Sequence, residues 1–159
     1  MILVTVGTQL PFTRLIGILD ELAPKLGRPI VAQIGDDPVI PRHIEHHRNM
    51  APAQFETLFR QANLIVAHAG IGTVLAAKKH RKPIIVFPRR AAMGEHRNDH
   101  QLATARQLVQ HVGVYVAQDG AELEALLSRT DLVAPDGRPS PSLVRLQSTI
   151  NQSLKAAVG

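Results

Sequence analysis

The sequence predicts an α/β protein built on a parallel, doubly wound sheet. Apolar runs of strand length alternate with segments whose apolar residues recur at helical spacing, which is the pattern of successive βαβ units. The chain has 159 residues, 45% of them hydrophobic, so it can bury the core of one domain. No internal repeat or low-complexity tract interrupts this alternation.

Each expected element has a local pattern behind it. Apolar runs predict strands at 2–6, 29–34, 64–67, 84–87 and 114–117, with a short strand near 46–49. Helical spacing predicts helices with apolar stripes from Phe12 to Leu22, from Phe55 through Leu58 and Phe59 to Ala62, and from Leu102 through Val109 to Val112. A further helix is expected to start at Thr73 and to end in the cations 78–82. Asp119 followed by Glu122 resembles a capping box for a helix through Leu127.

The C-terminal part is expected to be organised separately. Prolines and a glycine over 131–142 predict a linker after a domain of residues 1–130. Beyond it, Leu143, Leu146, Ile150 and Leu154 recur at helical spacing and predict a helix over 143–159. This helix either packs against the domain or docks on a partner.

Composition narrows the function classes. No run approaches the ~18 apolar residues of a membrane span, and no signal-peptide pattern precedes the first strand. The absence of cysteine excludes disulfides and thiolate zinc sites and suits a cytosolic protein. A net charge of +5 suggests nucleic acid, but 3% aromatic residues leave little for base stacking. An anionic ligand, or an anionic membrane surface near a partner, explains the charge as well.

Two polar stretches follow neighbouring apolar runs. Residues 68–73 follow the strand at 64–67, and the cluster 94–101 follows the strand at 84–87. Ligands of open α/β sheets bind beyond the carboxyl ends of the strands. We therefore expect one cleft, with phosphates held by the glycine loop and hydroxyls held by the polar cluster.

Each motif also has a simpler interpretation. Gly70 and Gly72 form only G-x-G, which a plain βα turn explains as well as a phosphate site. The segment 7–9 is a second loop of this type. His96 and His100 have zinc-ligand spacing, but the glutamate of H-E-x-x-H is missing, so we expect no metal. Arg89 and Arg90 suit a phosphate or carboxylate, or form a solvated turn.

These motifs resemble those of glycosyltransferase family 28, C-terminal domain. The resemblance is carried by Gly7-Thr8, by 68–73, by Pro88-Arg89 and by 94–101, and it covers roughly residues 1–128. Within the family, the chain is similar to small stand-alone proteins that form the catalytic, UDP-sugar-binding half of a split GT-B enzyme. Such proteins include bacterial exopolysaccharide and capsule subunits and the eukaryotic subunit that adds the second N-acetylglucosamine to a dolichol-linked sugar.

The resemblance implies a role for each motif. The diphosphate would be bound by Gly7, Thr8, Gln9, Gly70, Ile71, Gly72, Thr73 and Arg89. Asn49 and Met50 would contact the uracil, and Asp99, His100 and Gln101 would bind hydroxyls of the donor sugar. Glu95 and His96 are the candidate catalytic contributors. Ala76 departs from the family pattern, because many members carry a ribose-binding glutamate there.

The implied function is that of the donor-binding subunit of an inverting glycosyltransferase without metal or cofactor. A membrane-anchored partner subunit would hold a lipid-linked acceptor and supply the general base, placing this chain at the cytoplasmic face of the membrane. Two alternatives stay open: a non-catalytic UDP-sugar-binding or regulatory subunit, and a sugar-nucleotide epimerase, which would need both GT-B halves in one chain.

Overall fold

A computed structural model describes residues 1–138 and 140–158, and its centre is a six-stranded parallel sheet of order β3-β2-β1-β4-β5-β6. The predicted fold class is therefore confirmed. The strands are β1 (Ile2–Thr5), β2 (Ile30–Gln33), β3 (Glu45–His47), β4 (Leu64–Ala67), β5 (Ile84–Val86) and β6 (Val114–Val116). The helices are α1 (Thr13–Leu26), α2 (Pro52–Gln61), α3 (Ile71–Lys79), η1 (Ala91–Met93), α4 (His100–Leu108), α5 (Gly120–Leu127) and α6 (Pro141–Val158).

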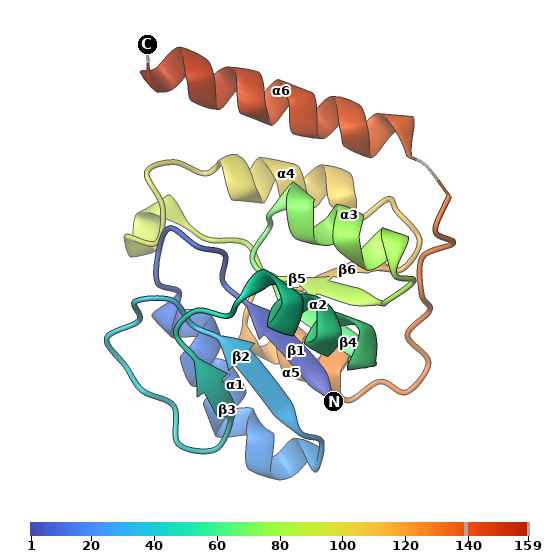
Figure 1. Ribbon diagram of the computed structural model, residues 1–159. Coiled ribbons are helices and arrows are strands. Elements are labelled where there is room, and N and C mark those ends of the chain that lie inside the picture. The colour runs from blue at the N-terminus through green and yellow to red at the C-terminus, as the bar shows by residue number, and fades with distance from the viewer. Residues whose placement is uncertain (139, 159) are drawn as a thin grey trace.

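Helices cover both faces of the sheet (Figure 1). Alternate strand residues point to opposite faces, so Ile2 and Val4 pack with α1 and α5, whereas Leu3 packs with α2, α3, α4 and the start of α6. Burial on both faces explains why the strands appear in the sequence as continuous apolar runs.

The strand order creates a crevice at one edge of the sheet. The chain moves outward from β1 through β2 to β3, then returns to place β4 on the other side of β1. The loops after β1 and β4 consequently leave their strands toward opposite faces of the sheet and open a gap between them. This topological switch point is where open α/β sheets bind ligands.

Some predicted boundaries differ from the structure. Helix α4 ends at Leu108, and Val109 and Val112 are 56% and 72% exposed rather than part of a buried stripe. The backbone turns instead, with the His111 amide bonded to the Leu108 carbonyl. Phe55 and Leu58 are only half-buried on α2, whereas Phe59 is in the core. Helix α3 starts at Ile71, two residues before the predicted Thr73.

The segment between α5 and α6 is extended chain that packs along the domain. The Val133 amide donates to the Tyr115 hydroxyl at 2.8 Å, and Lys78 lies 3.6 Å from Asp136. Pro139 of the predicted linker, and Gly159 at the end of the predicted helix, lie outside the described residues.

Helix α6 is anchored mainly by its first half. Leu143 is 1% exposed and Leu146 and Ile150 pack against the core, but every described residue from 151 onward is exposed, Leu154 at 52%. The predicted stripe is therefore buried only at its beginning. Among the described residues, no helix is long and apolar enough to cross a bilayer.

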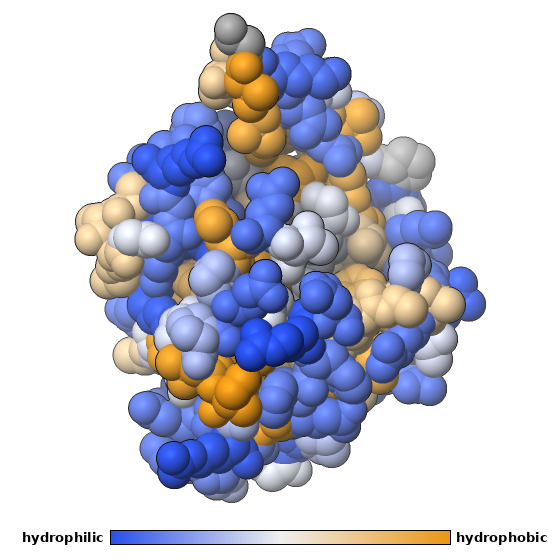
Figure 2. Space-filling view, turned by 60° about the vertical axis from the view of Figure 1, so that its left-hand side comes forward, coloured by the Kyte–Doolittle hydropathy of each residue, from blue (hydrophilic) through white to orange (hydrophobic). Residues whose placement is uncertain are grey.

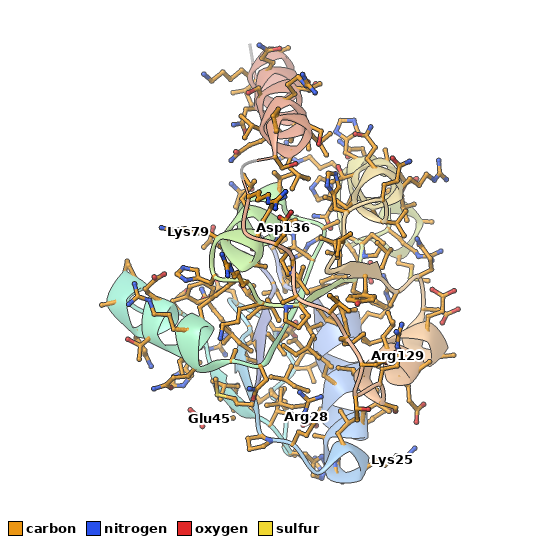
Figure 3. The ribbon with its side chains drawn as sticks, turned by 90° about the vertical axis from the view of Figure 1, so that its right-hand side faces the viewer. Lys25, Arg28, Glu45, Lys79, Arg129 and Asp136 are labelled. Carbon is orange, nitrogen blue, oxygen red and sulfur yellow. The ribbon has the colours of Figure 1, made fainter. Side chains whose placement is uncertain are left out.

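Charged side chains of both signs lie at the edge where the strands begin. Figure 3 faces this edge and shows Lys25, Arg28, Lys79 and Arg129 near the ends of α1, α3 and α5, together with the acidic Glu45 and Asp136. Helix C-termini attract cations because the helix dipole is negative there. The opposite edge carries the crevice.

Candidate functional site

Two adjoining cavities lie at the carboxyl ends of β1, β4 and β5. The first, of about 230 Å³, is lined by residues 6–10 together with Arg89. The second, of about 220 Å³, lies against residues 69–72 and the start of α4, with Gln147, Ile150, Asn151 and Leu154 of α6 on its far side. His68, His96 and Gln101 line both cavities. Figure 2 shows this side of the molecule as largely hydrophilic at its centre, with separate hydrophobic patches above and below.

The β1–α1 loop has the features of an anion-binding loop. Gly7 has a φ of +80°, a conformation that glycine adopts without strain. Within the described part of the chain, the backbone amides of Thr8, Gln9 and Leu10 make no hydrogen bond. Three free donors line the first cavity and are available to a ligand.

The glycine loop presents a second set of free amides. Helix α3 has no side-chain cap at Gly70 and no acidic residue in its first turn. The amides of Ile71, Gly72 and Thr73 are its first three, which have no partner within the helix. A Cβ at Gly72 would meet no atom within 4 Å, so space is open beside this turn. An uncapped helix N-terminus with open space attracts an anion.

His68 joins the two loops. Its ring fills the space above both Gly7 and Gly70, where a Cβ would lie 2.8 and 2.5 Å from ring atoms. Burial, with Arg89 and then His96 nearby, lowers the pKa of His68 to about 4. The imidazole is therefore neutral at pH 7. The side-chain Nε2 of Gln101 lies 3.2 Å from Nδ1 of His68.

Gln101 bridges the loops that follow β4 and β5. Its Oε1 accepts from the Ala69 amide at 3.3 Å and from the Arg89 amide at 3.0 Å, and its Nε2 contacts His68. The carboxamide is thus part of the internal framework of the site. Sugar binding by Gln101 stays a prediction, with only the Nε2 group left to serve it.

Arg89 is 2% exposed and directs its guanidinium to main-chain oxygens of Val6, Leu10 and Pro11. Burial lowers the pKa of Arg89 from its ordinary value, while the nearby carboxylates of Glu95 and Asp37 raise it. An arginine keeps its proton in such surroundings. Direct contact of Arg89 with the diphosphate stays a prediction, because its guanidinium N–H groups donate to carbonyls of the β1–α1 loop.

Glu95 and His96, the predicted catalytic pair, differ in their surroundings. Glu95 forms a bidentate ion pair with Arg14, at 2.6 and 2.9 Å, and also accepts from the Arg90 amide. Both its oxygens are therefore engaged in holding the loop after β5 to α1. His96 lines both cavities, and its Nδ1 lies 3.5 Å from the Asn98 amide. Of the two, His96 is the one placed to meet a ligand.

Of the remaining predicted residues, only His100 lines a cavity, whereas Thr73, Asp99, Asn49 and Met50 line neither of the two. Asp99 is exposed and accepts from the Ala91 amide, and His100 lines the second cavity. Asn49 and Met50 follow β3 and line neither cavity, so their assignment to uracil stays a prediction. No cluster of three metal-ligating side chains occurs within residues 1–138 and 140–158.

Sequence reasoning did not assign His68, Arg14 or Asp37. Asp37 is fully buried and accepts from the Phe12 amide and the Thr13 hydroxyl, which fixes the start of α1. His68 stands directly between β4 and Gly70, and that position could have identified it. Arg14 and Asp37 bond across long stretches of sequence, so no local pattern indicates them.

Comparison with known proteins shows the family and the fold of the chain. The family model for the glycosyltransferase family 28 C-terminal domain matches residues 1–137. A search of curated protein sequences finds no match. The solution structure of ALG13 superposes with a TM-score of 0.61 at 18% identity, covering 91% of this chain and 93% of ALG13.

Two larger proteins contain a similar fold as one part. The Streptomyces sp. SF2575 glycosyltransferase SsfS6, complexed with thymidine diphosphate, has a TM-score of 0.58 at 20% identity, with 82% of this chain covering 33% of that protein. Acinetobacter baumannii MurG has a TM-score of 0.55 at 20% identity, with 79% covering 38%. The chain thus spans nearly all of ALG13 but little more than a third of SsfS6 and MurG.

Proposed function

The chain belongs to the glycosyltransferase family 28 C-terminal domain family, and on this premise we propose that it is the donor-binding catalytic subunit of an inverting glycosyltransferase that uses a UDP-sugar. The observation that carries this proposal is the pair of loops at the topological switch point. They bring five free backbone amides, those of residues 8–10, 71 and 72, to one crevice, and the free amide of Thr73 follows in the same helical turn. A diphosphate needs such a ring of donors.

The chemistry would be direct displacement at the anomeric carbon of the donor sugar by an acceptor hydroxyl. The bond from the anomeric carbon to the diphosphate oxygen breaks as the new glycosidic bond forms, and UDP leaves. The loop amides, with open space beside Gly72, would stabilise the charge that develops on the diphosphate. No metal or cofactor is part of this proposal.

The other contacts follow the predicted assignments. Asp99 and His100, at the start of α4, and Gln101 would bind hydroxyls of a hexose-type sugar, and Asn49 and Met50 would meet the uracil. His96 faces the crevice and is the candidate catalytic contributor. Glu95 would act by supporting the loop, because Arg14 holds both its oxygens. The general base would come from the acceptor side.

A partner is proposed for the acceptor side. It would be a membrane-anchored subunit that holds a lipid-linked acceptor of polysaccharide synthesis and forms the other half of the cleft. This arrangement would place the chain at the cytoplasmic face of the membrane through its partner.

Ligand binding tests the proposal directly. UDP should raise the melting temperature by mass action, with NAD and ATP doing much less. The shift should persist in EDTA, since no metal is invoked. Stabilisation by NAD in preference to UDP would refute the proposed donor class.

A second candidate is a non-catalytic UDP-sugar-binding subunit. The ion pair that occupies Glu95 favours it, because only His96 of the predicted catalytic pair is then available. The two functions differ in a transfer assay with the co-expressed partner. Radiolabelled sugar should reach the lipid fraction only if the subunit is catalytic.

A further inference from the structure

Arg89 fastens both ends of the β1–α1 loop with one side chain. Its Nη2 donates to the Val6 carbonyl at 2.7 Å, where the loop begins, and to the Leu10 carbonyl at 2.8 Å, where it ends. Its Nη1 donates to the Pro11 carbonyl. The guanidinium also lies over the Phe12 ring, 4.5 Å from its centroid. These hydrogen bonds hold the two ends of the loop, on either side of residues 7–9, against one side chain.

The carbonyl groups that Arg89 binds matter for an anion site. Carbonyl oxygens carry partial negative charge, and an unpaired carbonyl in this loop could turn toward the cavity and repel a diphosphate. Bonded to a buried guanidinium, the oxygens of Val6, Leu10 and Pro11 are fixed beneath the loop. The amides of residues 8–10 meanwhile keep no partner in the described chain.

Arg89 also connects the β1–α1 loop to the glycine loop. Its own backbone amide donates to Gln101 Oε1, and the same oxygen accepts from the Ala69 amide just before Gly70. Arg89 is therefore linked to both loops: it bonds directly to carbonyls of the β1–α1 loop, and it shares Gln101 Oε1 with the residue that precedes Gly70.

We propose that Arg89 is a positioning residue that shapes the β1–α1 loop for the donor diphosphate before the donor arrives and acts on the ligand through that loop. The identity of the ligand rests on the proposed function, but the order of the empty loop does not. Lysine cannot replace Arg89, because an ammonium carries the charge without the fork that reaches three carbonyls.

The test compares Arg89→Ala, Arg89→Lys and the matched control Arg106→Ala, which removes an exposed arginine from α4. NMR order parameters of the amides of residues 7–10 are measured without ligand, and UDP affinity is measured by calorimetry. Guanidinium at millimolar concentration, far below denaturing levels, is added to Arg89→Ala to refill the vacated space.

We expect Arg89→Ala to lower the order parameters of the empty loop and to weaken UDP binding by about 10- to 100-fold. Added guanidinium should restore both, whereas Arg89→Lys should show the same two defects and Arg106→Ala neither. If Arg89→Ala does not fold, Arg89→Lys supplies both measurements.

Two results would overturn the inference. An unchanged empty loop with weakened UDP binding would mean that Arg89 contacts the ligand directly. Wild-type affinity in Arg89→Lys would mean that charge alone suffices. If the wild-type protein bound no UDP, the proposed function would fail, while the order of the empty loop would still decide the role of Arg89.

Discussion

Arginines at the carboxyl ends of the strands and arginines at the amino ends make different kinds of contact. At the carboxyl edge, Arg14 bonds to Glu95, 81 residues away, and Arg89 bonds to Val6, 83 residues away. At the amino edge, Arg129 bonds to Asp131, two residues away. The first kind of contact exists only in the folded chain, whereas the second can form locally.

The difference follows from what each edge has to do. The turns between helices and strands at the amino edge are short, and single hydrogen bonds, such as those from Met1 to Asn63 and from Lys82 to Arg60, connect them. Longer loops at the carboxyl edge must hold free amides in place, and water alone would not order them. Charged and amide side chains that reach across the sheet, such as Arg89 and Gln101, fix them at the cost of desolvation.

The largest effect should come from filling the space beside the glycine loop. Gly72→Val adds a side chain at a position where no other atom lies within 4 Å, so folding should change little. The added side chain should block the approach of the diphosphate to the loop. UDP affinity should fall about 100-fold or more, measured by calorimetry. Gly17→Val in α1, also without neighbours within 4 Å, is the control and should bind UDP normally. Normal UDP binding by Gly72→Val would place the ligand elsewhere.

A direct comparison of the two edges uses one arginine from each. Arg14→Ala leaves Glu95, whose side chain is 10% exposed, without its cation. The free energy of unfolding should drop by about 2–3 kcal/mol, since a half-broken buried pair is costly. Arg129→Ala removes an exposed local pair and should leave the melting curve unchanged. Equal melting temperatures for the two variants would contradict the distinction between the edges.

The pH dependence of stability should report on His68. Its pKa is about 4 in the folded protein against 6.5 as a free side chain, so between these values the unfolded chain binds more protons. The contribution of His68 to the free energy of unfolding is therefore fully present above pH 6.5. It is lost as the pH falls toward 4, which lowers the free energy of unfolding by up to roughly 3 kcal/mol. Urea unfolding of His68→Gln at a series of pH values should show a free energy of unfolding that lacks this dependence on pH. Parallel profiles for the two proteins would show that His68 is not held neutral.

The smallest effect on stability is expected at the end of α6. Removing residues 151–159 takes away only side chains that are exposed among the described ones, while Leu143 keeps the helix anchored. The melting temperature should stay close to wild type, while the second cavity loses Asn151 and Leu154 from its far side. Co-purification with a membrane-anchored partner should decrease if this end docks there. A large loss of stability would instead make it part of the core.

The sequence alone determined the elements and their order, because strands buried on both faces and amphipathic helices leave local patterns. Continuous apolar runs placed five of the strands within one residue, and the short polar strand β3 was expected within two residues of its bounds. Asp119 accepts from the Glu122 amide, as its spacing predicted. The glycines, the polar cluster and their place after β4 and β5 were likewise visible. Boundaries such as the end of α4 were less certain, since Val109 and Val112 continue the helical spacing beyond the last helical turn.

Only the tertiary structure decided which polar side chains face a ligand and which hold the loops. Arg89 and Glu95 are charged residues in polar stretches, and their sequence context suits ligand binding as well as internal support. Their partners are main-chain oxygens and an arginine brought near by the sheet. A side chain's role depends on which groups desolvate it and satisfy its hydrogen bonds, and those groups come from distant segments only when the chain has folded.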